Sequence, residues 1–272
     1  MAVGVRTLVD ARAREALGHA LAALGPYRED VVVVGGVAVA IYSEHPDFRG
    51  VADLGALATN DIDLLVPHPL AVRAGRSLDA TIRSAPCALE MGEGGTNGYR
   101  LTDPAAHGAV IELLAGADGM GLGQPQGDLL THRPDEAVLV RASPWSIDTQ
   151  LGRIAVPHPV GYAAQKLLMR ERRPLHKRGK DLVDALVVLG GFSAWWSRWW
   201  PAADHSPADP AWHDACGRAR DTLRYLFRPG GSGPTQVAMA YEDAGRTAAT
   251  SALPVIAGAV AQRILAAWDR AL

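Results

Sequence analysis

The stretch that decides the fold begins with VVVVGG at residues 31–36 and ends with TNDIDLLV at residues 59–66. Four valines followed by two glycines predict a buried β-strand that runs into a tight turn. An apolar helix is expected next, over residues 37–42. The second segment predicts another strand, and it carries Asp61 and Asp63 on one face because side chains alternate along a strand.

These two segments combine residue types that suit phosphate chemistry. Two carboxylates held side by side repel each other and offer oxygen ligands to a hard cation such as Mg²⁺ or Mn²⁺. Gly35 and Gly36 have no Cβ, so a phosphate can approach their backbone closely, and the N–H groups of a following helix would face it. A glycine pair or an Asp-x-Asp strand alone is common, but their order here favours metal-assisted phosphoryl or nucleotidyl transfer.

The order of glycine pair, helix and Asp-x-Asp strand resembles the signature of the polymerase-β-like nucleotidyltransferase superfamily. The form VGGVAVAIY…LATNDIDLL, with its long gap between Gly36 and Asp61, is similar to a bacterial branch near the abortive-infection toxin nucleotidyltransferases. Many members carry Ser or Thr after the second glycine, where a hydroxyl can reach a phosphate. This chain has Val37 there, which keeps a non-catalytic member of the fold as an alternative.

Periodicity along the chain indicates the organisation of the fold. Short apolar runs predict further strands at residues 87–89, 99–101, 109–114, 138–142 and 146–156, with a hairpin turn over the glycine-rich residues 91–99. Helical spacing predicts helices at residues 8–25, 69–84, 160–173, 179–189, 209–227, 235–249 and 251–271. We therefore expect an α+β protein: a mixed β-sheet nucleotidyltransferase core flanked by helices over residues 1–156, and a helical C-terminal domain over residues 157–272.

One further carboxylate stands in an apolar strand. Glu112 lies in AVIELLAG at residues 109–116, where a charged group is costly unless it is paired or faces water. A glutamate on a solvent-facing edge strand is the simple explanation. The resemblance implies instead that Glu112 is the third carboxylate of a metal site with Asp61 and Asp63, at a position where family members often carry Asp.

A basic cluster joins two predicted helices in the second half of the chain. Its members are Arg170, Arg172, Arg173, His176, Lys177, Arg178 and Lys180. Such a cluster alone predicts a solvated loop. The resemblance implies that Lys166 contacts a triphosphate and that Lys180 and Asp181 close the active site. In this interpretation Asp181 orients Lys166 or acts as a base toward an acceptor hydroxyl, and Asp184 is structural.

Composition sets limits on function and location. The chain has 272 residues and a formal net charge of −2, so contact with nucleic acid must come from a local patch. Its two cysteines have no paired spacing, and its beginning lacks the apolar core of a signal peptide, so a reducing, cytoplasmic location is expected. Tryptophans at positions 195, 196, 199 and 200 predict a packed helix face. A zinc site at His205, His213 and Cys216 has no evident fourth ligand.

Together these observations predict a metal-dependent nucleotidyltransferase that moves a nucleoside monophosphate from an NTP to an acceptor hydroxyl. The acceptor is a tRNA end, a protein side chain or a small molecule, and the basic cluster slightly favours tRNA. The resemblance implies a toxin-like role in phage defence with an antitoxin partner. The alternatives are a non-catalytic protein that senses nucleotides or binds a partner, and an enzyme that adenylylates a drug.

Overall fold

The structure is a computed structural model of the chain. It describes residues 11–51, 54–55, 57, 59, 61–66, 70–91, 97–115, 134–195, 209–246 and 252–271.

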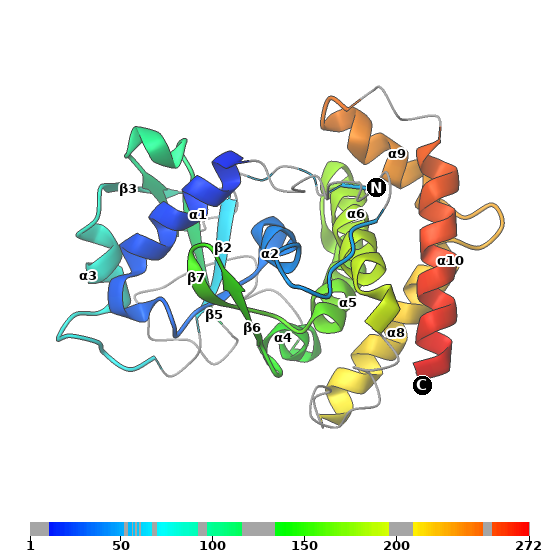
Figure 1. The fold of residues 1–272 in the computed structure, drawn as a ribbon, viewed down its shortest axis with the longest axis horizontal. Coiled ribbons are helices and arrows are strands. Elements are labelled where there is room, and N and C mark those ends of the chain that lie inside the picture. The colour runs from blue at the N-terminus through cyan, green and yellow to red at the C-terminus, as the bar shows by residue number, and fades with distance from the viewer. Residues whose placement is uncertain are drawn as a thin grey trace.

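Within these residues, a mixed sheet of five strands lies at the centre of the N-terminal half (Figure 1). The strand order is β1-β2-β5-β4-β3, in which only β2 and β5 run parallel. The strands are β1 Val32–Val33, β2 Asp61–Val66, β3 Cys87–Met91, β4 Asn97–Leu101 and β5 Val110–Ala115. A separate antiparallel hairpin is made of β6 Trp145–Thr149 and β7 Gly152–Val156. The expected α+β class, with strands first and helices later, is confirmed.

Helices occupy both sides of this sheet-containing half and most of the C-terminal half (Figure 1). They are α1 Ala11–Leu24, α2 Gly35–Tyr42, α3 Leu78–Arg83, α4 Pro134–Arg141, α5 Pro159–Met169, α6 Leu175–Gly191, α8 Pro210–Leu226, α9 Gly233–Asp243 and α10 Leu253–Ala271. Short 3₁₀ turns are η1 Gly25–Tyr27, η2 Pro104–Ala106, η4 Arg170–Arg172 and η5 Ser193–Trp195. No helix of the described ranges is both long and apolar enough to cross a bilayer.

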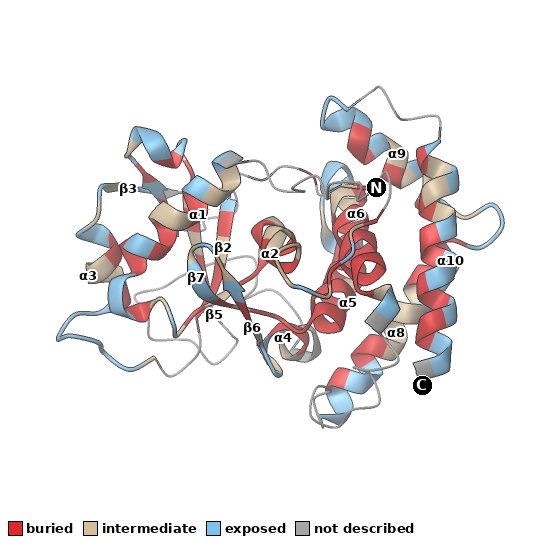
Figure 2. Ribbon diagram, in the orientation of Figure 1, coloured by how far each residue is buried: buried red, intermediate tan, exposed pale blue. Residues whose placement is uncertain are grey.

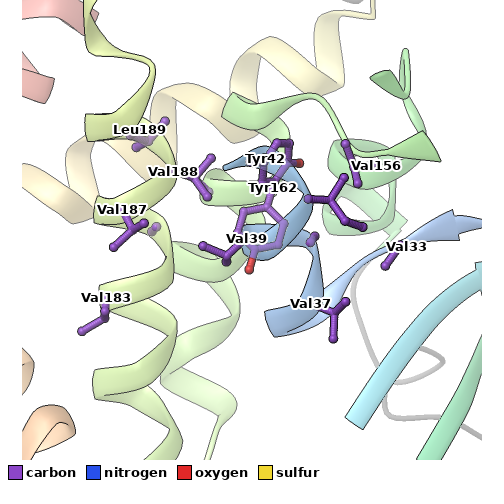
Figure 3. Close-up of a cluster of buried hydrophobic side chains, with 14 of the residues drawn as sticks. Val33, Val37, Val39, Tyr42, Val156, Tyr162, Val183, Val187, Val188 and Leu189 are labelled. Carbon is purple, nitrogen blue, oxygen red and sulfur yellow. The ribbon is translucent and has the colours of Figure 1, made fainter. Parts of the chain in front are cut away.

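Helix α2 links the sheet to the C-terminal helices. Its sequence GGVAVAIY is apolar on every side, which suits a helix buried all round. Figure 3 shows Val39 and Tyr42 of α2 lying against Tyr162 of α5 and the valines of α6. Figure 2 shows α5 and α6 buried along most of their length. One hydrophobic cluster therefore contains residues of both halves.

The two faces of β2 contact different groups of residues. Ile62, Leu64 and Val66 belong to the main hydrophobic cluster. Leu65 points to the other face, where it joins Val34, Leu114 and Val140 in a second, smaller cluster. Because of the strand's alternation, Asp61 and Asp63 share the face of Leu65.

The predicted strand at residues 138–142 is wrong, because these residues lie at the end of α4 and just after it. A short apolar run does not by itself separate a strand from a buried helix segment. Pro134 occupies the first position of α4, where its missing N–H costs nothing. Residues 116–133, which precede α4, lie outside the described residues.

The helix predicted over residues 69–84 is mostly absent, since only Leu78–Arg83 is helical. Ala74 and Gly75 have positive φ angles of 48° and 70°, which no helix accommodates. The hydroxyl of Tyr27 holds this turn: it accepts from the N–H of Arg73 at 2.8 Å and donates to the carbonyl of Arg76. Ser77 then caps the short helix.

The basic cluster was expected in a loop, but much of it forms the first turns of α6. Pro174 ends the preceding η4 segment and α6 begins directly after it, at Leu175. The glycine pair likewise opens α2 rather than preceding it. The hairpin around residues 91–99 is confirmed by the antiparallel pairing of β3 and β4, which extends to Met91 and Asn97. Tryptophans 196, 199 and 200 and His205 lie outside the described residues.

Candidate functional site

Two carboxylates meet at one level of the parallel strand pair. Asp63 of β2 lies directly across from Glu112 of β5, and Asp61 lies across from Val110. Register partners in a parallel pair point to the same face. The structure thus places Glu112 beside the Asp-x-Asp pair, on the face of the sheet that the pair occupies.

The closeness of these carboxylates changes their protonation. Burial, followed by the charges of Asp63 and Asp61 and a hydrogen bond to Asp63, raises the pKa of Glu112 from 4.5 to about 7. Burial also raises the pKa of Asp63, although the cations Lys166, Arg173 and Lys180 partly oppose this. The protein therefore keeps acidic groups together at a cost, which is typical of functional sites.

The donor set at this position suits a hard divalent cation. All three side chains offer carboxylate oxygens, as Mg²⁺ and Mn²⁺ prefer. Among the described residues, which include Asp61, Asp63 and Glu112, no group of three or more His, Cys, Asp or Glu side chains is placed to hold a metal ion by itself. Mg²⁺ is usually held by one or two carboxylates together with substrate phosphates, so an incomplete protein cage is compatible with it.

Position 35 requires a glycine because its backbone lies against the side chain of Asp63. Its φ angle is +65°, a region that favours glycine, and a Cβ added there would lie 1.7 Å from Oδ2 of Asp63. The N–H of Val34 donates to the carbonyl of Asp63 at 2.9 Å, which ties the glycine step to β2. The glycine pair and the paired aspartates thus form one structural unit.

Gly36 is approached by a cation and a hydroxyl-bearing residue. A Cβ at Gly36 would lie 2.8 Å from Nζ of Lys180 and 2.9 Å from the methyl carbon of Thr59. Gly36 is in the first turn of α2, where N–H groups have no partner within the helix. Lys180 is far from the glycine pair in the sequence, so tertiary packing brings the two together. Thr59 was missed, although it stands at the beginning of the TNDIDLLV segment.

Lys166 and Asp181 form a buried ion pair between α5 and α6. The ammonium of Lys166 donates to Oδ1 of Asp181 at 2.7 Å and lies 3.5 Å from Oδ2 of Asp184. Lys180 also reaches Asp184, at 3.2 Å. Burial alone would lower the pKa of Lys166, but Asp181 and Asp184 raise it, so the lysine stays charged.

The opposite balance holds for the carboxylate of Asp181. Burial would raise the pKa of Asp181, but Lys166 and Arg173 hold it below its usual range. Asp184 is fully buried and joins Lys166 to Lys180, which agrees with the structural role expected for it. Asp181 is placed to orient Lys166, one of the two roles predicted for it.

The start of α6 adds two cations that sequence reasoning did not single out. Arg173 lies with Nε 3.5 Å from Oδ2 of Asp181 and acts electrostatically on Asp63 as well. Lys177 is exposed and acts on Glu112. Their signal in the sequence was the basic cluster itself, whose members could not be ranked before the fold was known.

The side chain of Val37 is buried in the main cluster, among the residues drawn in Figure 3. The hydroxyl that many family members carry after the second glycine thus has no substitute at that position. The residue that contacts the glycine pair from within the core is Tyr162, whose hydroxyl donates to the carbonyl of Gly35 at 2.9 Å. Tyr162 was missed, although it precedes Lys166 by one helical turn.

The suggested zinc site finds no support among the described residues. His213 is exposed on α8 while Cys216 is buried in the core, and no cluster of metal-binding side chains includes them. Helical packing explains both positions.

Comparison with known proteins agrees with this geometry. Residues 13–94 match the family model described as Nucleotidyltransferase, a range that contains the glycine pair and the Asp-x-Asp strand. Over these residues the chain is therefore similar to nucleotidyltransferases.

The match covers less than half of the chain, and Glu112, Lys166 and Lys180 lie beyond it. A crystal structure of an antigenic nucleotidyltransferase-like protein from Paracoccidioides brasiliensis is similar with a TM-score of 0.45 and 18% identity, over 79% of this chain and 88% of that one. No curated protein matches the sequence.

Proposed function

We propose that this protein is a metal-dependent nucleotidyltransferase that moves a nucleoside monophosphate from an NTP to an acceptor hydroxyl. The family match supports nucleotidyl transfer in general. The proposal of metal dependence rests on one observation: Asp63 and Glu112 are register partners on parallel strands, directly beside Gly35. Asp63 and Glu112 together offer oxygen ligands to a cation. The backbone of Gly35, which a phosphate can approach, lies next to them.

Asp61, Asp63 and Glu112 would hold Mg²⁺ or Mn²⁺ together with oxygens of the NTP. The bound cation would supply neutralisation of phosphate charge and polarisation of the reacting phosphoryl group. The raised pKa of Glu112 supports this role, because a carboxyl group with a pKa of about 7 would release its proton to water near neutral pH when a cation binds.

Gly36 and Lys180 are the proposed contacts for the β- and γ-phosphates. The free N–H groups at the start of α2 and the ammonium beside them both favour negative charge. Lys166 is held by Asp181 and Asp184, so its contribution is a fixed positive charge near Asp63. Arg173 adds a second fixed cation from the same side.

The transfer step follows from this arrangement. The acceptor oxygen attacks the α-phosphorus, a new P–O bond forms, and the bond to the bridging oxygen breaks as pyrophosphate leaves. The proton of the acceptor hydroxyl needs a base. Glu112 suits this better than Asp181, because Glu112 lies beside Asp63 on the carboxylate face whereas Asp181 accepts a hydrogen bond from Lys166. We therefore assign Asp181 to the orientation of Lys166.

The acceptor is proposed to be the end of a tRNA. Arg172, His176 and Lys177 are exposed around the start of α6, and Lys177 acts on Glu112, so this basic surface borders the carboxylates. It could follow a phosphate backbone although the chain as a whole is slightly acidic. A toxin-like role in a bacterial cell, with an antitoxin as partner, belongs to the same proposal. A protein side chain or a small molecule such as a drug is the alternative acceptor.

A non-catalytic role is favoured by one observation, the burial of Val37 where relatives carry a hydroxyl. Thr59 does not replace that hydroxyl, because it turns its methyl carbon toward Gly36 while its hydroxyl donates to the carbonyl of Asp61.

The proposal is tested by isothermal titration of ATP, GTP, CTP and UTP, with and without Mg²⁺, into the wild type and an Asp61→Ala/Asp63→Ala variant. Asp214→Ala/Asp221→Ala is the matched control, since it removes two exposed aspartates from α8. We expect Mg²⁺-dependent binding of at least one NTP, lost in the first variant and kept in the control. Binding of none of the four to the wild type would contradict the proposal.

A transfer assay then identifies the acceptor. Each NTP labelled at the α-phosphate is incubated with total tRNA, with the protein itself and with an aminoglycoside, in parallel with the γ-labelled NTP. Nucleotidyl transfer attaches the α-label and never the γ-label. Label on tRNA supports the proposed acceptor, and label on another acceptor only would overturn it.

A further inference from the structure

Tyr162 connects the C-terminal helices to the glycine pair. It lies on α5, its side chain is fully buried, and its hydroxyl donates to the carbonyl of Gly35 at 2.9 Å. In Figure 3 its hydroxyl points toward the beginning of α2, where Val37 is labelled. The ring itself is held by an edge-to-face contact with Tyr42, with 5.5 Å between ring centroids.

Because of peptide-bond geometry, the hydrogen bond to the carbonyl of Gly35 also affects the direction of the N–H of Gly36. In a trans peptide the C=O of one residue and the N–H of the next point in opposite directions. The carbonyl of Gly35 and the N–H of Gly36 belong to the same peptide plane. When Tyr162 fixes the carbonyl toward the core, it also fixes the N–H away from the core. That N–H is one of the first-turn donors of α2 that lack an intrahelical partner.

A fixed orientation matters at this particular peptide. Glycine has more conformational freedom than any other residue, so two glycines in sequence form the softest step of the backbone. Gly35 is also held in a left-handed conformation, with its Cα against the carboxylate of Asp63. A rotation of the peptide would therefore change both the N–H direction and the packing on Asp63. The hydroxyl of Tyr162 restrains this rotation from the core side.

The same tyrosine is adjacent to the cationic part of the site. The ammonium of Lys166 lies 5.7 Å from the centroid of its ring, one helical turn along α5. Burial and the nearby carboxylates raise the pKa of Tyr162 well above its ordinary value, so the hydroxyl remains a donor throughout the physiological range.

We propose that Tyr162 is a positioning residue that holds the Gly35–Gly36 peptide with its N–H directed at a phosphate of the bound nucleotide. This inference rests on the proposed function for its ligand, a nucleoside triphosphate. It adds a residue from the C-terminal half to the phosphate-binding step. Tyr162 acts through the backbone of the glycines and contacts no substrate itself.

Tyr42 provides a matched control. It is also fully buried, it packs against Tyr162, and its hydroxyl donates to a backbone carbonyl, that of Pro157, at 2.6 Å. Tyr162→Phe and Tyr42→Phe therefore each remove one buried hydroxyl and keep the ring. A merely structural hydrogen bond predicts equal effects of the two substitutions on every readout.

The test compares both variants with the wild type in three measurements. The midpoint temperature of thermal unfolding, Tm, is expected to fall by a similar amount in each variant, about 2–4 °C. Hydrogen exchange of the backbone over residues 35–42 is expected to accelerate at the first residues in Tyr162→Phe only. Titration of the tightest-binding NTP with Mg²⁺ is expected to show an affinity about tenfold weaker for Tyr162→Phe and within about twofold of wild type for Tyr42→Phe.

The outcomes separate this inference from the proposed function. If the wild type binds an NTP and the two variants bind it equally well, the positioning role of Tyr162 is wrong while the proposed function stands. If exchange near Gly36 is unchanged in Tyr162→Phe, the restraint on the peptide is wrong whatever the nucleotide does. If the wild type binds none of the four NTPs, the proposed function fails, and the phosphate assigned to this peptide fails with it.

Discussion

Asp63 and Glu112 lie directly across from each other on two parallel strands, with their carboxyl groups on the same face of the sheet. Burial, together with the charges of Asp63 and Asp61, raises the pKa of Glu112 to about 7. Without a cation, this part of the molecule is therefore strained electrostatically. The following predictions start from that strain and from the contacts around it.

Glu112→Gln should stabilise the metal-free protein at pH 8. A carboxyl group whose folded pKa is raised favours folding at low pH and loses that contribution as the pH rises, here between about 4.5 and about 7. We expect a gain of about 1 kcal/mol at pH 8, or about 2–4 °C in Tm, and little change at pH 4. Thermal unfolding in EDTA across this pH range measures the effect.

The exposed Glu171→Gln serves as its control and should leave the pH profile unchanged. A wild-type profile that is flat between pH 4 and pH 8, relative to Glu112→Gln, would show that neither burial nor Asp63 raises the pKa of Glu112 in the folded protein.

Gly35→Ala should be far more disruptive than Gly75→Ala. Both glycines have positive φ angles, 65° and 70°, so both substitutions impose backbone strain of about 1 kcal/mol. A Cβ at Gly75 meets nothing within 4 Å, whereas one at Gly35 would overlap Oδ2 of Asp63. We expect Gly35→Ala to cost at least about 2–3 kcal/mol in urea unfolding.

Removal of the Asp63 side chain provides a further check on this collision. In an Asp63→Ala background, Gly35→Ala should cost clearly less than in the wild type, because only the strain and a 3.0 Å approach to the remaining Cβ of residue 63 are left. Equal costs of the two alanine substitutions in the wild-type background would contradict the contact.

Lys166→Met should destabilise the protein much more than Lys180→Met. Lys166 has a side-chain exposure of 8% and pairs with both Asp181 and Asp184, so its loss takes the nearest cation from Asp181 and one of two lysines from Asp184. About 3 kcal/mol is expected. Lys180 is 27% exposed and pairs with Asp184 only, so about 1 kcal/mol or less is expected.

Urea unfolding measures both costs, and NTP titration separates the roles. Lys180→Met should weaken Mg²⁺-dependent NTP binding while the fold is preserved. Addition of Asp181→Asn to Lys166→Met should recover part of the lost stability, since it removes a buried charge whose remaining partner, Arg173, lies 3.5 Å away. Equal stability losses for the two lysines would refute this description of the network.

Tyr241→Phe should loosen the connection that leads into the Asp-x-Asp strand. The hydroxyl of Tyr241, on α9, accepts from the N–H of Gly55 and donates to its carbonyl, each at 2.7 Å. We expect a loss of about 1–2 kcal/mol and faster hydrogen exchange around Gly55. Tyr225→Phe, at an exposed residue of α8, should change neither. Unchanged hydrogen exchange at Gly55 in Tyr241→Phe would show that the two hydrogen bonds of the Tyr241 hydroxyl do not restrain the backbone of Gly55.

Local patterns were sufficient for the elements that carry the carboxylates. Period-two alternation in DIDLLV placed Asp61 and Asp63 on one face, and apolar periodicity found α1, α5, α8 and α10 within a few residues. Errors fell where the local signal was short or was overridden by contacts. The apolar run at residues 138–142 was one case, and the turn held by Tyr27 was another.

The sequence by itself determined the order of strand, glycine pair, helix and Asp-x-Asp strand, because each depends on neighbouring residues alone. Through a family resemblance it also presented candidate site residues, namely Glu112, Lys166, Lys180 and Asp181. No local pattern could rank these residues. Only the tertiary structure decided that Glu112 faces Asp63, since a slip of one residue in strand register would turn it to the other face. Packing of α5 and α6 likewise decided that Lys180 reaches Gly36 and Tyr162 reaches Gly35, because these contacts join segments that are distant in the chain.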